Sequence, residues 1–276
     1  MAKRKQVRTA NAWLDGLKTV LYAALIAILI RTVVAEPFNI PSSSMQATLL
    51  EGDYLFVSKF SYGYSRHSLP MSPNLFEGRI FGRLPERGDV AVFKTPQDNA
   101  TDYIKRIVGL PGDRIQMLRG VLHINGAPVR LEPVGTFTVA SIDRRSGLPN
   151  PPVEARRYIE TLPGGRRHFI LNLSDFERGD NTPEFLVPAG HVFAMGDNRD
   201  ASLDSRFQAG EGPGFIPIAN LVGRAEFLFF SVDEARGRWL APWTWPFAIR
   251  WSRLLDAIDS EVPEARRWVP PSGGAA

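Results

Sequence analysis

The feature that most constrains this chain is an apolar segment close to its N-terminus. Residues 20–30, VLYAALIAILI, are all apolar, and several basic residues precede them. Extended to residues 13–35, the segment would form a helix about 35 Å long at roughly 1.5 Å per residue, enough to cross a hydrocarbon core of about 30 Å. Because basic flanks stay on the cytoplasmic side, we expect a cytoplasmic tail over 1–11, a transmembrane helix over 12–35 and the rest of the chain outside.

A cleavable signal peptide is the alternative interpretation of this segment. A basic start followed by an apolar core of 11 residues fits that description as well. However, no clean small-x-small cleavage site followed by a polar start is evident. The apolar run instead leads through TVVAEPFNIP directly into a serine cluster, which favours a retained anchor.

Size and composition favour a β-rich globular body after this segment. The chain has 276 residues, enough for one large domain or two smaller ones. Its 22 prolines and 24 glycines are spread along the sequence, which is typical of many short elements joined by turns. The net charge of +4 is modest, so no nucleic-acid partner is indicated. No cysteine is present, which excludes disulfides, a cysteine nucleophile and thiolate metal sites.

Strand-like runs recur along the body. GDYLFVSKF at 52–60 and RGDVAVFK at 87–94 each open with a Gly-Asp turn and have strand lengths. Asn125-Gly126 between two apolar runs is a strong signal for a two-residue hairpin, and NLVGRAEFLFFS at 220–231 predicts a final strand. We therefore expect a mainly β fold. Its β core is predicted in two pieces, over 36–113 and 191–231. An inserted β subdomain is predicted over 114–190, and a C-terminal segment over 232–276.

Apolar residues without an obvious partner occur in a loop between the first two strands. The segment 61–86 is rich in glycine and proline, which suits an extended loop or ribbon. We expect exposed apolar tips that contact either lipid or the body, at Leu75, Phe76, Ile80 and Phe81.

Tryptophan is concentrated near the C-terminus. Five of the six tryptophans are Trp239, Trp243, Trp245, Trp251 and Trp268. The sequence FAIRWSRLLDAI has apolar residues at helical spacing, which predicts an amphipathic helix. Tryptophan together with arginine is typical of the membrane interface, and a helix packed on the body is the alternative.

A serine cluster and a distant lysine suggest a nucleophile with its base. Ser42, Ser43 and Ser44 follow the apolar segment, and Lys105 lies further on in DYIKRIVGLPGD. A serine hydroxyl is a weak nucleophile unless a neighbouring base is unprotonated. The ordinary lysine pKa is about 10.4, and lowering it by roughly three, or about 4 kcal/mol, requires burial. Apolar neighbours that could supply this burial are Tyr103, Ile104, Ile107 and Val108.

Four motifs occur in order after the apolar segment: IPSSSMQATLLEGDYLFVSKFSYG, RGDVAVFK, DYIKRIVGLPGD and MGDNRDASLDSR. Together they make the chain resemble the bacterial type I signal peptidases over roughly residues 12–231. Any one motif would be weak, since Gly-Asp turns and serine runs are common, but four in sequence after an anchor are specific. The resemblance implies a membrane-bound serine endopeptidase with a Ser-Lys dyad and a mainly β catalytic body.

The resemblance assigns a role to each matching residue. Ser44, directly before the methionine, corresponds to the nucleophile, and Lys105 to the general base. Ser42 corresponds to the hydroxyl that forms the oxyanion hole with the backbone N–H of Ser44, and losing such a donor typically costs about a hundredfold to a thousandfold in rate. Ser202 corresponds to the serine that orients the lysine. Taken without the motifs, Ser44 would be an ordinary turn hydroxyl, Lys105 a surface lysine, and Ser42 and Ser43 caps of the turn after Pro41.

Further residues are expected to support the site or to bind the substrate. The charged residues of the last motif are assigned to structural support, and they are Asp197, Arg199, Asp204 and Arg206. A calcium loop is an alternative for this stretch, but the spacing and terminal Glu of such a site are missing. The resemblance places substrate contacts at Ile40, Pro41, Asp102, Tyr103 and Ile104. Both isoleucines could equally belong to the core.

A histidine-based triad is a further alternative. His191 lies near the last motif, so that a Ser-His-Asp arrangement with Asp197 is conceivable. Its neighbourhood, VPAGHVFAMGDN, is typical of a turn that leads into a strand. A structural histidine and a catalytic dyad are therefore the favoured interpretation.

The chain departs from the family pattern at several positions. Ala47 replaces the usual proline of the nucleophile motif, and Ala201 replaces a common asparagine. The aromatic-Trp-Gly expected after Arg206 reads Phe-Gln-Ala-Gly over 207–210, and no disulfide is possible. None of these departures removes a reacting group, so they bear on loop geometry and substrate preference.

These observations predict a peptidase in the bacterial cytoplasmic membrane, with its catalytic domain in the periplasm. It is expected to cleave signal peptides from exported preproteins after an Ala-x-Ala-like site, without metal or organic cofactor. The expected partners are preprotein signal peptides, membrane lipid and the export translocon. A specialised peptidase for one dedicated secreted substrate and a non-catalytic envelope scaffold are the alternatives.

Overall fold

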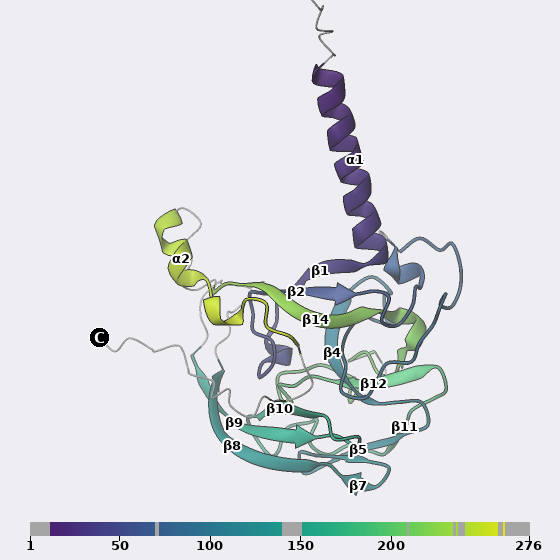
Figure 1. The fold of residues 1–276 in the computed structure, drawn as a ribbon. Helices are drawn as coiled ribbons and strands as arrows, with labels where there is room; N and C mark the ends of the chain where they lie inside the picture. Colours follow the sequence, from purple (N-terminus) through teal and green to yellow (C-terminus); the bar gives the residue numbers. More distant parts are fainter. Residues whose placement is uncertain are drawn as a thin grey trace, which may run out of the picture.

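A long N-terminal helix stands apart from the β-rich body of the protein (Figure 1). The computed structural model describes residues 12–69, 72–139, 151–208, 210–233, 236, 241–258 and 262. Helix α1 runs over Ala12–Val33, and its stretch Trp13–Val33 is long and apolar enough to cross a membrane. The predicted basic tail 1–11 lies outside the described residues.

The helix ends two residues before the predicted boundary. Val34 is a turn residue, and strand β1 (Ala35–Asn39) begins directly after it. Two effects stop the helix here. Pro37 disfavours helical backbone at Glu36, and Ala35 already pairs with Ser58 of the neighbouring strand.

The body is built on a seven-stranded antiparallel sheet that includes every strand predicted outside the insertion. Its order is β1-β2-β14-β3-β4-β12-β13. The remaining strands of this sheet are β2 (Asp53–Ser58), β3 (Val90–Lys94), β4 (Asp102–Gly109), β12 (His191–Met195), β13 (Ile216–Pro217) and β14 (Leu221–Ser231). The predicted strands at 52–60, 87–94 and 220–231 are confirmed as β2, β3 and β14.

Two smaller sheets form the end of the body away from α1 (Figure 1). One has the order β10-β9-β8 and the other β11-β5-β6-β7. Their strands are β5 (Arg114–Leu118), β6 (Val121–Ile124), β7 (Ala127–Pro128), β8 (Arg130–Val139), β9 (Val153–Thr161), β10 (Arg167–Asn172) and β11 (Phe185–Leu186). The predicted hairpin is confirmed between β6 and β7, where Asn125 and Gly126 both have positive φ, 55° and 80°, as a type I′ turn requires.

Both faces of the main sheet are covered, and this places its central strands in the core. On β3, Val90 and Val92 belong to one buried apolar cluster, while Ala91 and Phe93 belong to another. Successive side chains of a strand point to opposite faces. A strand covered on both faces therefore reads as a continuous apolar run, as VAVF does here.

Within its described residues, the loop over 61–86 contains a short 3-10 helix, η2 (Arg66–Ser68), and an isolated antiparallel bridge between Tyr64 and Ile80. Leu75, Ile80 and Phe81 are exposed as expected, with exposed fractions of 74%, 49% and 82%. Phe76 differs from the prediction, because it is half-buried.

The predicted amphipathic helix near the C-terminus is wrong for the residues that the structure describes. Residues 241–258 instead form three short turns of helix, η4 (Pro242–Thr244), α2 (Trp245–Ala248) and η5 (Trp251–Arg253). Isolated bridges join Ile249 to Val232 and Ala257 to Phe227. These contacts to the end of β14 override the helical spacing of the sequence. Trp239 and Trp268 lie outside the described residues.

Candidate active site

Ser44 lies in a single turn of 3-10 helix, η1 (Ser43–Met45), between β1 and β2. Met45 and Leu49 have no exposed surface and anchor the turn in the core beneath the main sheet, whereas Ser44 keeps an exposed fraction of 7%. Ala47 has φ +106°, which the proline ring cannot adopt because it holds φ near −65°. The departure from the family motif at this position therefore accompanies a backbone conformation that excludes proline.

Lys105 reaches Ser44 from the central strand β4. Its Nζ donates to Ser44 Oγ at 2.6 Å and to the Ile104 carbonyl at 3.0 Å. Burial lowers the pKa of Lys105 to about 8, against the opposing charges of Asp204 and Asp197. An amine with such a pKa is largely neutral in mildly alkaline solution, and the sequence-based expectation of a buried lysine is met at this position.

The predicted oxyanion donor is close to the nucleophile. Ser42 Oγ lies 3.4 Å from Ser44 Oγ. Ser42 occupies the N-cap position of η1, yet its side chain makes no capping hydrogen bond. The hydroxyl is therefore not engaged in the structural role that the alternative interpretation gave it.

Ser202 lies on the other side of the turn and is buried. Its Oγ meets no strict hydrogen-bond geometry among the described residues, but it interacts with the Asp204 carboxylate and helps to lower the pKa of that group. A Cβ atom built on Gly196 would lie 2.3 Å from Ser202 Oγ and 2.5 Å from the Ser44 carbonyl oxygen. Glycine at 196 thus allows the Ser202 hydroxyl and the nucleophile turn to approach each other, although the predicted contact of Ser202 with Lys105 is not formed as a hydrogen bond within the described residues.

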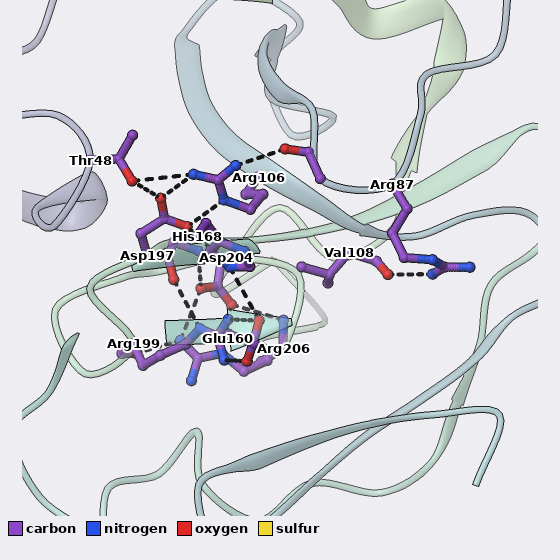
Figure 2. Close-up of polar contacts among 12 residues, drawn as sticks. Thr48, Arg87, Arg106, Val108, Glu160, His168, Asp197, Arg199, Asp204 and Arg206 are labelled. Atoms are coloured by element: carbon purple, nitrogen blue, oxygen red, sulfur yellow. Dashed lines mark hydrogen bonds and ion pairs between the residues drawn. The ribbon is translucent and has the colours of Figure 1, made fainter. Parts of the chain in front are cut away.

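Figure 2 shows a buried cluster of three arginine-carboxylate pairs, whose charges act on the neighbouring Lys105. Each pair joins an arginine to an acid by two hydrogen bonds at 2.6 to 2.9 Å, and every one of these side chains is at most 2% exposed. The pairs are Arg106 with Asp197, Arg199 with Glu160, and Arg206 with Asp204. Two-point geometry of this kind is the strong form of a charged hydrogen bond.

The cluster keeps its acids ionised. Burial alone raises the pKa of Asp197, Asp204 and Glu160, but the adjacent arginines outweigh it and hold each pKa below its ordinary value. His168 lies among them, with Nε2 at 3.2 Å from Glu160 Oε2 and 3.9 Å from Asp197 Oδ1. Burial and the charge of Arg106 lower the pKa of His168, so its ring is neutral near pH 7.

Asn198 and the Asp197 of this cluster also hold in place the turn that carries Ser44. Asn198 donates from its backbone N–H to the Ser44 carbonyl at 3.1 Å and from its side chain to the Ser43 carbonyl at 3.2 Å. Thr48 Oγ1 donates to Asp197 Oδ2 at 2.5 Å. Residues of the last sequence motif therefore hold this turn on both sides, at Ser43 and Ser44 and at Thr48.

Several of these residues were not predicted from the sequence. Arg106 directly follows Lys105, and no local pattern in the sequence indicates that both of these cations are buried. Glu160 and His168 lie on β9 and β10. Arg199 donates a hydrogen bond to Glu160, which is 39 positions away in the sequence. Asn198 and Thr48 lie within the motifs, but nothing in the sequence indicates which residues they contact. Only the tertiary arrangement identifies these partners.

The predicted substrate contacts lie directly after β1, at Ile40 and Pro41, and at the start of β4, near Ser44 and Lys105. Ile40 and Ile104 are 2% and 9% exposed and belong to the same apolar cluster. Pro41 and Asp102 are exposed, and the ring of half-buried Tyr103 lies 5.4 Å from Lys105 Nζ. On β4, β3 pairs with all of Asp102–Arg106, whereas β12 pairs only from Arg106 onward. The stretch Asp102–Lys105 therefore offers one edge to a further strand.

The histidine and metal alternatives receive no support. His191 Nδ1 lies 3.0 Å from the Ala189 carbonyl at the start of β12, while Asp197 is paired with Arg106. In the part of the chain that the structure describes, no group of three His, Cys, Asp or Glu side chains could hold a metal ion.

Comparison with known proteins gives consistent results. The sequence profile described as "Signal peptidase, peptidase S26" matches residues 13–230. A protein named signal peptidase I from Rickettsia conorii is 42% identical over 218 residues, which are 76% of this chain and 77% of the relative. The protein of the same name from Rickettsia canadensis is 42% identical over 234 residues, or 81% and 80% of the two chains. A crystal structure of a signal peptidase I from Enterococcus faecalis aligns over 51% of this chain and 97% of its own at 24% identity, with a TM-score of 0.28 that is too low to bear on the fold.

Proposed function

The chain belongs to the signal peptidase family, peptidase S26, and on that premise we propose that Ser44 and Lys105 are the catalytic dyad with which it removes signal peptides from exported preproteins. Family membership makes the protein an enzyme, so the scaffold alternative is not retained. One observation carries the proposal about the dyad. The buried Lys105 amine, whose pKa is lowered to about 8, lies 2.6 Å from Ser44 Oγ.

The chemistry follows from the direction of that hydrogen bond. The protonated amine donates to Ser44 Oγ, and once the amine is neutral its lone pair accepts the Ser44 proton instead. Ser44 Oγ then attacks the carbonyl carbon of the scissile peptide bond, and Lys105 holds the proton. When the tetrahedral intermediate collapses, the carbon-nitrogen bond breaks and Lys105 gives the proton to the leaving amine. Water, deprotonated by Lys105, then attacks the resulting Ser44 ester, the bond between the carbonyl carbon and Ser44 Oγ breaks, and Lys105 returns the proton to Ser44 Oγ.

Neighbouring groups stabilise and orient these steps. Ser42 Oγ, 3.4 Å from Ser44 Oγ, and the Ser44 backbone N–H donate to the oxygen that becomes negative in the intermediate. The neutral amine keeps two N–H groups, of which one donates to the Ile104 carbonyl. We assign the second N–H to Ser202 Oγ, which is buried beside Gly196 together with the Ser44 carbonyl.

The substrate is proposed to bind as an extended strand on the free edge of β4. Main-chain hydrogen bonds to Asp102–Ile104 would hold it in register, while alternate side chains enter pockets beside Ile40 and Ile104. Both isoleucines are almost fully buried, and we propose that they line pockets that are shallow. Shallow pockets fit the small residues of an Ala-x-Ala site.

The membrane places the enzyme where these substrates emerge. Helix α1 fits a single transmembrane anchor, and Glu36 just after it pairs with the buried Lys59 at 2.9 Å, which fixes the strand that follows the anchor. We propose that the N-terminus is cytoplasmic, that the body lies in the periplasm at the cytoplasmic membrane, and that the export translocon delivers the preprotein. Lipid is proposed to contact the exposed apolar residues on the anchor's side of the body.

The substrate proposal is tested by mapping the product. The enzyme in lipid vesicles should cut a preprotein with Ala at the first and third positions before the cleavage site, and mass spectrometry should place the new N-terminus directly after the Ala-x-Ala sequence. Replacing the Ala directly before the cleavage site by Phe should abolish cleavage. Cleavage of a single secreted protein, with other preproteins left intact, would support the dedicated peptidase instead.

The pH dependence of the rate should report the protonation of Lys105. With its pKa lowered to about 8, kcat/KM is expected to rise roughly tenfold per pH unit below pH 8 and to level off above it. The measurement is a pH profile with a peptide substrate that carries no titrating group in this range. A rate that stays flat from pH 6 to pH 9 would contradict a lysine base.

The C-terminal aromatics should matter for membrane-embedded substrates only. Figure 1 shows α2 rising beyond β14 on the same side of the body as α1, and Trp243, Trp245, Phe247 and Trp251 are 73%, 46%, 79% and 62% exposed. Because tryptophan favours the membrane interface, replacing all four by Ser is expected to slow cleavage of a vesicle-embedded preprotein about tenfold. Cleavage of a short soluble peptide should change less than about twofold.

A matched control for that experiment is Phe176→Ser. Phe176 is 93% exposed but lies between β10 and β11 in the chain, and Figure 1 shows both of these strands in the part of the body away from α1. This variant should cleave both substrates at the wild-type rate. Equal slowing of both substrates by the fourfold variant would point to damage of the site rather than to lost lipid contact.

A further inference from the structure

The C-terminal bracket, which we define as residues 241–258, lies beyond the residues 13–230 that match the family. It packs along β14 by backbone hydrogen bonds, from Arg250 N to the Ser231 carbonyl at 3.0 Å and from Ile258 N to the Glu226 carbonyl at 2.8 Å. These contacts carry two of its arginines toward the loop that follows the nucleophile turn.

Arg253 clamps this loop at two points. Its Nη2 donates to the Thr48 carbonyl at 3.0 Å and to Asp53 Oδ2 at 2.5 Å, and its Nε donates to Asp53 Oδ1 at 3.2 Å. Arg250 Nη1 adds a bond of 2.9 Å to the Glu51 carbonyl. The bracket thus contacts three residues between positions 48 and 53.

Asp53 is the residue through which these contacts fix the backbone of the loop. It has no exposed surface, and its carboxylate also accepts from Leu50 N at 2.7 Å and from Ser231 Oγ at 2.6 Å. Its carbonyl accepts from Ile40 N at 2.8 Å. A buried carboxylate needs a paired cation, and Arg253 approaches it more closely than Arg250, whose guanidinium lies 3.8 Å away.

Thr48 connects this clamp to the nucleophile. Its carbonyl accepts from Arg253, its hydroxyl donates to Asp197, and its N–H donates to the Met45 carbonyl at 3.0 Å. Met45 directly follows Ser44. The turn between Ser44 and Thr48 is therefore held on one side by the charged cluster and on the other by the bracket.

We propose that Arg253, assisted by Arg250, is a positioning residue for the Ser44 nucleophile, so that this chain completes its active site with a segment beyond the family match. The inference rests on the proposed function, in which Ser44 attacks the substrate. Arg253 touches neither the substrate nor the reacting atoms. It sets the position of the turn, and a misplacement of about 1 Å can cost about a hundredfold in rate.

The test compares full-length variants in detergent with a peptide substrate. Arg253→Gln should lower kcat about a hundredfold, as expected for a nucleophile displaced by about 1 Å, with KM within about twofold of wild type. Arg253→Lys keeps the charge opposite Asp53 and should recover at least about tenfold of that loss. The pH midpoint of the remaining activity should stay near 8, because Lys105 is untouched.

Arg87→Gln is the matched control. Arg87 pairs with Asp113 at 2.9 Å and donates to the Val108 carbonyl at 2.5 Å, and its side chain is 14% exposed against 18% for Arg253. Figure 2 shows its guanidinium pointing away from the charged cluster. Its kcat should equal that of wild type.

Two results would overturn the inference: a folded Arg253→Gln with wild-type kcat, or an equal loss of kcat in Arg87→Gln. If Arg253→Gln fails to fold, Arg253→Lys and Arg250→Gln decide, since both are expected to lower kcat several-fold with KM unchanged, and wild-type kcat in both would reject the clamp. The proposed function is judged separately. Cleavage by wild type but not by Ser44→Ala supports it whatever Arg253 contributes.

Discussion

Lys105→Met is expected to abolish cleavage and, at the same time, to stabilise the protein. Methionine fills the same buried space but cannot accept a proton, so turnover should fall by at least about a thousandfold. Below pH 8 the folded protein keeps a buried ammonium whose pKa is lowered from 10.5 to about 8. That difference corresponds to about 3 kcal/mol of stability, at about 1.36 kcal/mol per pH unit, which the methionine variant should regain.

The stability gain should disappear as the pH rises. Between pH 8 and 10.5 the unfolded chain binds a proton that folded Lys105 does not, so the stability of the wild type increases over this range. Urea unfolding at pH 7 and pH 10, followed by tryptophan fluorescence, measures the difference. A methionine variant that is inactive but less stable than wild type at pH 7 would show that the buried Lys105 ammonium does not destabilise the folded protein.

The second large effect is expected from breaking the buried charged cluster. Arg106→Met leaves Asp197 buried without its two-point partner, and both side chains are only 1% exposed. Removing one member of such a pair typically costs about 3 to 5 kcal/mol. The double variant Arg106→Met with Asp197→Leu should recover at least about 2 kcal/mol of that loss, since well-packed apolar residues often replace a buried ion pair without penalty.

The same urea assay measures this effect, with Arg178→Met as its control. Arg178 pairs with Glu211, also by two hydrogen bonds, but the two side chains are 73% and 46% exposed. Its removal should leave the unfolding midpoint unchanged, because exposed pairs contribute little. A double variant that is less stable than both single variants would contradict the account of the cluster.

Local patterns in the sequence predicted β2, β3, β14 and the hairpin between β6 and β7. The Gly-Asp turns before β2 and β3 and the Asn125-Gly126 hairpin have direct backbone causes, and each was found. The helical spacing near the C-terminus was misleading, because bridges to the end of β14 decide the conformation there. Tertiary contacts override local preference where a short segment can extend an existing sheet.

The site was predicted unevenly for a related reason. Ser44 and Lys105 stand 61 positions apart, and only their motifs identify them as neighbours, since no spacing rule connects a turn to a strand that is distant in the sequence. The same limit hid Glu160, His168 and Arg253, which lie outside the motifs and reach the site through the fold. The roles of Ser42 and Ser202 stay predictions. Ser42 Oγ lies 3.4 Å from Ser44 Oγ, while Ser202 forms no hydrogen bond with Lys105 among the described residues.

The most direct test of the central claim is cleavage of a purified preprotein with an Ala-x-Ala site by wild type, Ser44→Ala and Lys105→Ala in lipid. The account predicts that only the wild type cuts, at that site, while circular dichroism shows all three folded. Cleavage by either variant at the wild-type rate would contradict the Ser-Lys dyad. An intact preprotein in all three, with a folded wild type, would contradict general signal-peptide cleavage and favour a dedicated substrate.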